Sequence, residues 1–274
     1  MLKADRWRSG VCAMVIGVLD VALCFGEAAS AKSAEIARVE LAKPFRTAAA
    51  WRLVATQGPQ AVDYGGDPAP GPLLLCLEKK AAGPCPSDPS PMPPVGREGA
   101  PDGWEPHYLK VAKPVYPEGA AASPLLLIVT ASLHAGDGGQ IIATQLFRYR
   151  RAVDRFERVF AHATGTNNNQ EVRFMPSGRL RGDVVSAEPT NDAPYGYWVE
   201  VDRFTPDHAY RRVLRHRSAT RYQDGNDLAV IDAEMPNIQR RLGLWTPGSP
   251  LPLPQGRAKP CPNPHLKAGA LWCS

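Results

Sequence analysis

The chain lacks the short motifs that identify several common enzyme classes. It has no Gly-x-Ser-x-Gly nucleophile elbow, no His-Glu-x-x-His metal motif, no phosphate-binding glycine-rich loop with a lysine, and no dinucleotide fingerprint. It also lacks paired Cys-x-x-Cys motifs and histidines at ligand spacing, so we expect no zinc site. Without an aromatic-basic RNA motif or a zinc finger, nucleic acid is not an expected partner.

Lysine is missing from a long central part of the chain, between Lys113 and Lys259. The positive charge there is therefore on arginine, whose planar guanidinium suits carboxylates and phosphates such as those of anionic glycans or lipid headgroups. The whole chain has a net charge of +5. Four acids interleave with these arginines: Asp154, Glu157, Glu200 and Asp202. This interleaving favours a solvated sheet surface with ion pairs across strands over one basic patch.

The first 31 residues have the features of an export signal. Lys3, Arg6 and Arg8 precede a mostly apolar stretch at 11–25, which Asp20 interrupts, and residues 29–31 read Ala-Ser-Ala, the small-x-small pattern of a cleavage site. The apolar stretch is too short for a stable membrane anchor, although a buried or anchoring helix is the alternative. We expect a periplasmic or secreted protein that does not span a membrane after cleavage.

Four cysteines follow the predicted signal: Cys76, Cys85, Cys261 and Cys273. An even number in an exported chain indicates disulfides, and four cysteines allow three pairings among which sequence alone does not choose. We favour the two local pairings, Cys76 with Cys85 and Cys261 with Cys273, because short loops close readily. Free thiols are the alternative, since Cys76 follows an apolar run and could simply be buried.

The segment 141–231 has the pattern of consecutive β-hairpins. Tyr197, Val199 and Val201 alternate with Trp198 and Glu200, which is the period of a half-buried strand. Three hairpins are expected, pairing 141–149 with 155–162, 171–175 with 183–187, and 195–204 with 209–217. A fourth would join 220–222 to 228–231 through an Asp-Gly turn.

The remaining chain extends this β-rich pattern. Residues 51–55, 73–77 and 107–113 are strand candidates, and the continuous apolar run at 125–133 predicts a central strand buried on both faces. Proline and glycine at 83–106 indicate a long loop, and Pro236 suits the first turn of a short helix at 236–242.

We therefore expect a single β-rich domain at 32–246 and a proline-rich, disulfide-held tail at 247–274. The predicted fold is an all-β, hairpin-built antiparallel sandwich of two layers or a partly closed barrel, with one short C-terminal helix. A small β-propeller is the alternative, although no internal repeat aligns.

Two polar clusters are candidate binding sites. Asn167, Asn168, Asn169 and Gln170 concentrate amides that could bind sugar hydroxyls, although a tight turn favours the same residue types. Asp224, Asn226, Asp232 and Glu234 supply oxygen donors for calcium, the one cofactor we consider, although the residue order is not that of an EF-hand. The alternative is an ordinary hairpin turn at Asp224.

These features favour an exported binding or interaction protein of the bacterial envelope whose ligand is a glycan or another envelope component, held by loops at one end of the β scaffold. A carboxylate-dependent hydrolase of envelope polysaccharide is the first alternative, with Glu171, Asp183 and Glu188 as its candidate catalytic residues. The second alternative is a structural or assembly partner without a small-molecule site.

Overall fold

A computed structural model describes residues 33–79, 85, 87–91, 104–117, 123–254 and 261–273 of the chain. The predicted export signal and most of the loop at 83–106 lie outside these residues. Within them, the strands pair antiparallel, and one helix, α2 (Val230–Arg241), is longer than two turns. The all-β, hairpin-built fold with one C-terminal helix is therefore confirmed.

The strands form three main sheets, with strand orders β1-β2-β5, β6-β7-β8-β9 and β10-β11-β12-β13. The first sheet contains β1 (Ala34–Glu40), β2 (Trp51–Gln57) and β5 (Leu73–Lys79). The second contains β6 (Tyr108–Val115), β7 (Leu125–Ala131), β8 (Ile141–Arg150) and β9 (Arg155–Gly165). The third contains β10 (Glu171–Phe174), β11 (Val184–Pro189), β12 (Gly196–Phe204) and β13 (Tyr210–Arg221).

Shorter elements connect or flank these sheets. The one-turn helix α1 (Ala42–Phe45) links β1 to β2, and the last residues form the ribbon of β14 (His265–Lys267) and β15 (Ala270–Trp272). A second ribbon pairs β3 (Ala61–Val62) with β4 (Pro68–Ala69). The described residues also include three single 3₁₀ turns, which are η1 (Arg151–Val153), η2 (Asn167–Asn169) and η3 (Gly178–Leu180).

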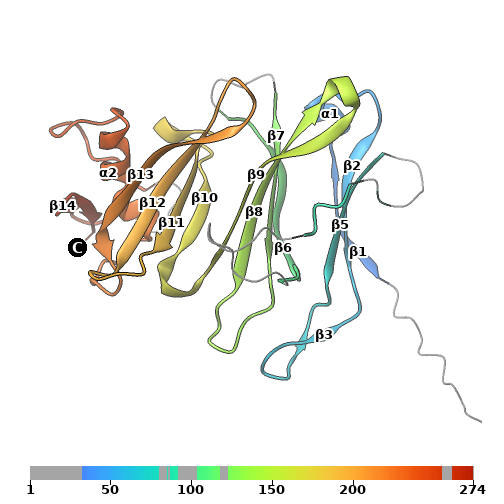
Figure 1. The fold of residues 1–274 in the computed structure, drawn as a ribbon, viewed down its shortest axis with the longest axis horizontal. Helices are drawn as coiled ribbons and strands as arrows, with labels where there is room; N and C mark the ends of the chain where they lie inside the picture. Colours follow the sequence, from blue (N-terminus) through green and yellow to red (C-terminus); the bar gives the residue numbers. More distant parts are fainter. Residues whose placement is uncertain are drawn as a thin grey trace, which may run out of the picture. The chain divides into compact units, whose positions relative to one another are not determined.

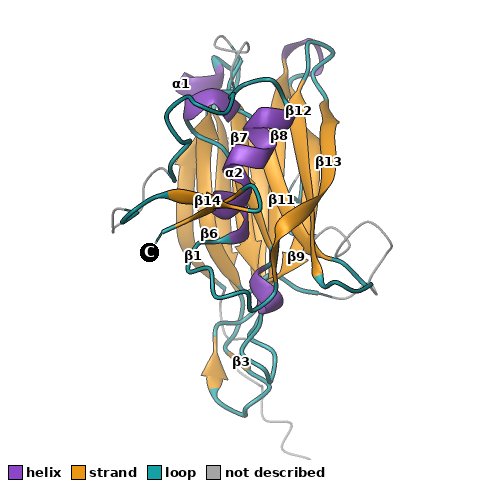
Figure 2. Cartoon of the chain, turned by 90° about the vertical axis from the view of Figure 1, so that its left-hand side faces the viewer, coloured by secondary structure: helices purple, strands orange, loops and turns teal. Residues whose placement is uncertain are grey.

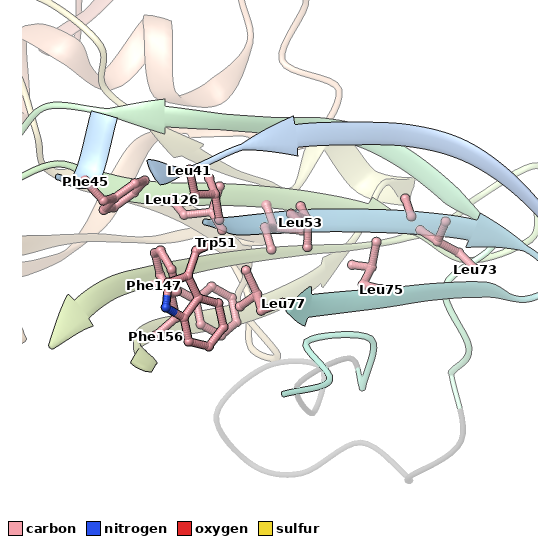
Figure 3. Close-up of a cluster of buried hydrophobic side chains, with 12 residues drawn as sticks. Leu41, Phe45, Trp51, Leu53, Leu73, Leu75, Leu77, Leu126, Phe147 and Phe156 are labelled. Atoms are coloured by element: carbon pink, nitrogen blue, oxygen red, sulfur yellow. The ribbon is translucent and has the colours of Figure 1, made fainter. Parts of the chain in front are cut away.

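The second sheet lies between the other two (Figure 1). Leu126 and Ile128 pack with Leu53 and the other apolar side chains of the first sheet (Figure 3). Leu125 and Leu127 point the opposite way and pack against the third sheet. Because neighbouring side chains of a strand alternate between faces, the continuous apolar run of β7 is buried on both sides, as the sequence predicted.

The antiparallel sandwich therefore contains three sheets, one more than the two layers that we expected. The reason is that the second sheet is apolar on both faces, so it needs a partner on each side. No closed barrel forms among the described strands. Those strands make two four-stranded meanders and one three-stranded sheet, fewer than the four blades of the smallest propellers, so the propeller alternative gains no support.

Helix α2 lies over the outer face of the third sheet (Figure 2). Val230, Ile231 and Ile238 face β11 and β12 with helical spacing and are almost fully buried. The helix therefore begins at Val230, so the expected strand at 228–231 is wrong. The expected position of Pro236 in the first turn is also wrong, because Pro236 lies in the helix interior. The apolar stripe that packs on the sheet outweighs the local preference of proline for a helix start.

The two local disulfides, Cys76 to Cys85 and Cys261 to Cys273, are formed. The first ties β5 to the residues that follow it, and the second joins Cys261 to the end of the β14–β15 ribbon. Disulfides persist where the surroundings are oxidising, so they indicate such a compartment. None of the helices in the described part of the chain is long and apolar enough to cross a membrane.

Candidate functional site

The amide-rich loop at 167–170 uses its side chains to hold its own turn. Gln170 Nε2 donates to Asn167 Oδ1 over 2.5 Å, and Gln170 Oε1 accepts a hydrogen bond from Thr164. Asn168 and Asn169 have positive φ angles of 57° and 58°, a backbone conformation that asparagine tolerates better than most residues. Two of the four candidate amides are thus engaged within the loop.

The four candidate calcium ligands lie in separate environments. Asp224 and Asn226 accept hydrogen bonds from nearby backbone N–H groups, Asp232 pairs with Arg173, and Glu234 is completely buried beside β13. The hairpin that would fold Asp224 back over Asp232 does not form, because the chain enters α2 at Val230. Among the residues described, no three or more His, Cys, Asp or Glu side chains gather closely enough to hold a metal ion.

The three candidate catalytic carboxylates are each held by a basic side chain. Each binds its own partner: Glu171 binds Arg173, Asp183 binds Arg203, and Glu188 binds His162. Glu171 additionally accepts the backbone N–H of Ile231 on the α2 side of the third sheet, whereas Glu188 contacts β9 on the opposite side. The sheet therefore separates Glu171 from Glu188, and this geometry does not make them a pair flanking one substrate.

Sequence reasoning missed a pocket of about 390 Å³ at one end of the stacked sheets. Its walls come from α1, the start of β7, the β8–η1 junction and the β12–β13 hairpin. Its lining includes three arginines, three aromatic residues and one histidine: Arg148, Arg150, Arg151, Phe45, Tyr149, Phe204 and His208. We call these residues the basic pocket.

The basic pocket has more guanidinium groups than carboxylates. Glu157 lies 2.9 Å from Arg150 and 3.6 Å from Arg148, and it also binds Arg155. Hydrogen bonds from Arg155 and then Arg150 lower the pKa of Glu157, so it is ionised at neutral pH. Three arginines thus share one negative charge. Arg151 is exposed and its guanidinium has no ion pair or hydrogen bond within the described ranges, and the buried Nε of Arg148 has no acceptor.

A network around Asp154 holds the arginine-bearing turn in place. Its carboxylate accepts hydrogen bonds of 2.7 Å from Trp51 Nε1 and from the Tyr149 hydroxyl, and it pairs with Lys79 Nζ over 2.6 Å. The contact with Lys79, followed by those with Trp51 and Tyr149, lowers the pKa of Asp154 to about 2. Because Trp51 and Lys79 belong to the first sheet, this network fixes the β8–β9 turn against that sheet.

Aromatic side chains supply the apolar part of the basic pocket. Phe45 is almost fully buried, while Tyr149 and Phe204 are partly exposed. His208 lies 6.2 Å from Phe204, ring centre to ring centre, and its positive φ of 62° belongs to the β12–β13 turn. Guanidinium donors beside aromatic faces can hold an anion attached to a ring or an aliphatic body.

One sequence signal for this site exists, the closely spaced Arg148, Arg150 and Arg151. The expected pairing of arginines with interleaved acids does occur elsewhere, for example between Arg212 and Glu200. The sequence could not reveal that several arginines would share Glu157. Nor could it reveal that the guanidinium of Arg151 would have no ion-pair partner among the described residues. No family model, curated protein or solved structure matches this chain.

Proposed function

We propose that this protein is an exported binding protein of the bacterial envelope and that it holds an anionic glycan in the basic pocket. The observation that carries the proposal is the excess of guanidinium charge in a pocket built from loops. Loops positioned by a rigid β scaffold are a common location for binding sites. A carboxylate, phosphate or sulfate group on the sugar would supply the negative charge that the arginines lack.

The chemistry of the pocket favours an anionic ligand over a neutral sugar. A guanidinium group binds a carboxylate or phosphate through two parallel hydrogen bonds, and such charge-assisted bonds are about twice as strong as neutral ones. The partly exposed rings of Tyr149 and Phe204 offer apolar faces against which a sugar ring can pack. Arg151, which has no protein partner among the described residues, is the arginine most available to a ligand.

The two disulfides support the proposed location, because disulfides persist mainly in oxidising compartments. Together with the predicted export signal, they favour the periplasm or secretion. The hydrolase alternative gains less support, because Glu171 and Glu188 contact elements on opposite faces of the third sheet. A purely structural role predicts no glycan binding at all, so the same experiment distinguishes it.

The test is to measure binding of the purified chain, without its predicted signal, to a panel of neutral and anionic glycans. We expect binding of glycans that carry carboxylate, phosphate or sulfate groups and much weaker binding of their neutral counterparts. Arg151→Gln should weaken the binding about tenfold, the effect of losing one charge-assisted hydrogen bond.

The matched control is Arg241→Gln, which removes one positive charge from an exposed arginine on α2, outside the basic pocket. Its affinity should equal that of the unaltered protein. Equal loss in the two variants would mean that only the net charge matters, which would refute the pocket. Binding to neutral glycans alone, or to none, would refute the anionic ligand.

A further inference from the structure

A second, smaller cavity of about 180 Å³ lies far along the chain from the basic pocket, between α2, the β10–β11 connection and residues 253–254. Met175, Leu180, Met235 and Leu253 form its apolar walls. Leu180 and Met235 are buried, and Leu253 is 47% exposed at the boundary with solvent. These side chains make a slot with the apolar character of a small-ligand site.

Gln239 provides the unusual polar group of this cavity. The residue is only 8% exposed and lines the cavity, yet its side-chain amide has no hydrogen-bond partner in the described part of the chain. The other buried polar side chains of α2 have partners. Asp232 pairs with Arg173, and Asn237 donates a hydrogen bond to Glu234. An amide offers two donors and one acceptor, and where Gln239 lines the cavity these groups are open to a ligand.

The charges at the other end of the cavity are already neutralised. Arg173 binds both Glu171 and Asp232, at 2.8 and 2.6 Å, so this end has no unpaired positive charge among the described residues to attract an anion. Asp232, Met235 and Gln239 follow each other at spacings of three and four residues, so they share one face of α2. The cavity therefore presents an aliphatic slot with a neutral amide at one end, while the exposed Arg179, whose guanidinium donates to the Leu244 carbonyl, lies where the slot opens into solvent.

The cavity continues into a wider groove of about 500 Å³. The two share Gly178, Arg179, Gln239 and Leu253, and the groove extends along residues 243–253. Gln239 thus lies where the narrow slot opens into the groove. A ligand with a side group in the slot could continue through the groove as an extended chain.

We propose that this cavity is a second binding site, for a neutral ligand that combines a branched aliphatic group with a secondary amide. This is the chemistry of a leucine-like residue within a peptide. The aliphatic group fills the slot between Met175 and Met235, and the amide exchanges two hydrogen bonds with the side chain of Gln239. The site is independent of the basic pocket and does not rest on the glycan proposal.

The test uses the protein labelled with ¹³C at its methionine methyl groups, because Met175 and Met235 line the slot. The probes are N-acetyl-leucine N-methylamide and a capped Ala-Leu-Ala tripeptide, each titrated to about 10 mM, the range in which a ligand of this size binds. We expect saturable shifts of the Met175 and Met235 signals with both probes. If the tripeptide binds more tightly than the single-residue probe, the natural ligand is a peptide. If the two bind equally, the natural ligand is a free small amide.

Gln239→Met should weaken probe binding about tenfold, because it keeps the length of the side chain and removes the amide. The control is Gln60→Met, at an exposed glutamine that lines neither the slot nor the groove. Arg151→Gln should bind the probes normally, which separates this site from the basic pocket. Unmoved methionine signals would mean that the slot holds only water, and unchanged affinity of Gln239→Met would refute recognition by the amide.

Discussion

Replacing Asp154 with asparagine tests whether its carboxylate anchors the arginine-bearing turn to the first sheet. Asparagine keeps the shape of the side chain and tolerates the positive φ of 44° at this position. The substitution removes the charge that Lys79, Trp51 and Tyr149 all contact. Only the electrostatic part of the network should therefore change.

The size of the effect follows from the pKa of the carboxyl group. Lowering it from 3.8 to about 2 corresponds to at most about 2.4 kcal/mol of folding free energy. The side chain of Asp154 is 33% exposed, so solvent screening reduces this value, and we expect a loss of about 1–2 kcal/mol at neutral pH. The indole N–H of the buried Trp51 keeps an acceptor in the variant, which prevents a larger loss.

The pH dependence gives an independent check. A carboxyl group whose pKa is lower in the folded protein contributes stability that is present above its unfolded pKa and lost as the pH falls through its folded pKa. The difference in unfolding free energy between the protein and Asp154→Asn should thus be constant above about pH 5 and shrink between about pH 4 and pH 2.

Urea unfolding followed by tryptophan fluorescence measures this difference at each pH. Asp227→Asn is the control, since Asp227 is exposed and has no ion pair or hydrogen bond to any residue that the structure describes. Its stability should match that of the unaltered protein at about pH 7. A difference for Asp154→Asn that persists unchanged down to about pH 2, or that is absent at neutral pH, would refute the electrostatic reasoning.

Three further predictions concern the fold and the proposed ligand. Glu234→Gln should lower the unfolding free energy by about 2–3 kcal/mol, because the buried carboxylate accepts hydrogen bonds from Thr220 and Asn237; an unchanged urea midpoint would contradict this. Replacing Cys76 and Cys85 together with alanine should cost about 2–3 kcal/mol in thermal unfolding under oxidising conditions, and should cost nothing extra once both proteins are reduced. Raising the salt concentration from about 0.05 to 0.5 M should weaken anionic-glycan binding several-fold, and salt-independent affinity would argue against the basic pocket.

The hairpin region was predictable because strand alternation is a local property. The expected pair 141–149 and 155–162 became β8 and β9, and the expected pair 195–204 and 209–217 became β12 and β13, each within a few residues. The short loops between the cysteines likewise made the local disulfides the simplest pairing.

The strand β1 and the true start of α2 were not predictable in the same way. The sequence of β1, Ala-Glu-Ile-Ala-Arg-Val-Glu, has few large apolar residues because β1 is an edge strand that is mostly exposed. It becomes a strand by pairing with β2. Val230 and Ile231 suit a strand by composition, and only the neighbouring third sheet, which buries one stripe of α2, selects the helix.

The amino-acid sequence by itself determined the antiparallel hairpins, the doubly buried β7 and the local disulfides, because each depends on residues close together in the chain. Tertiary structure alone decided that three sheets stack, and that Phe45, Arg148 and Phe204 line one pocket. It also left the amide of Gln239 without a partner among the described residues. The physical reason is that strand periodicity tells which residues share a face, whereas the packing of distant segments decides what that face meets.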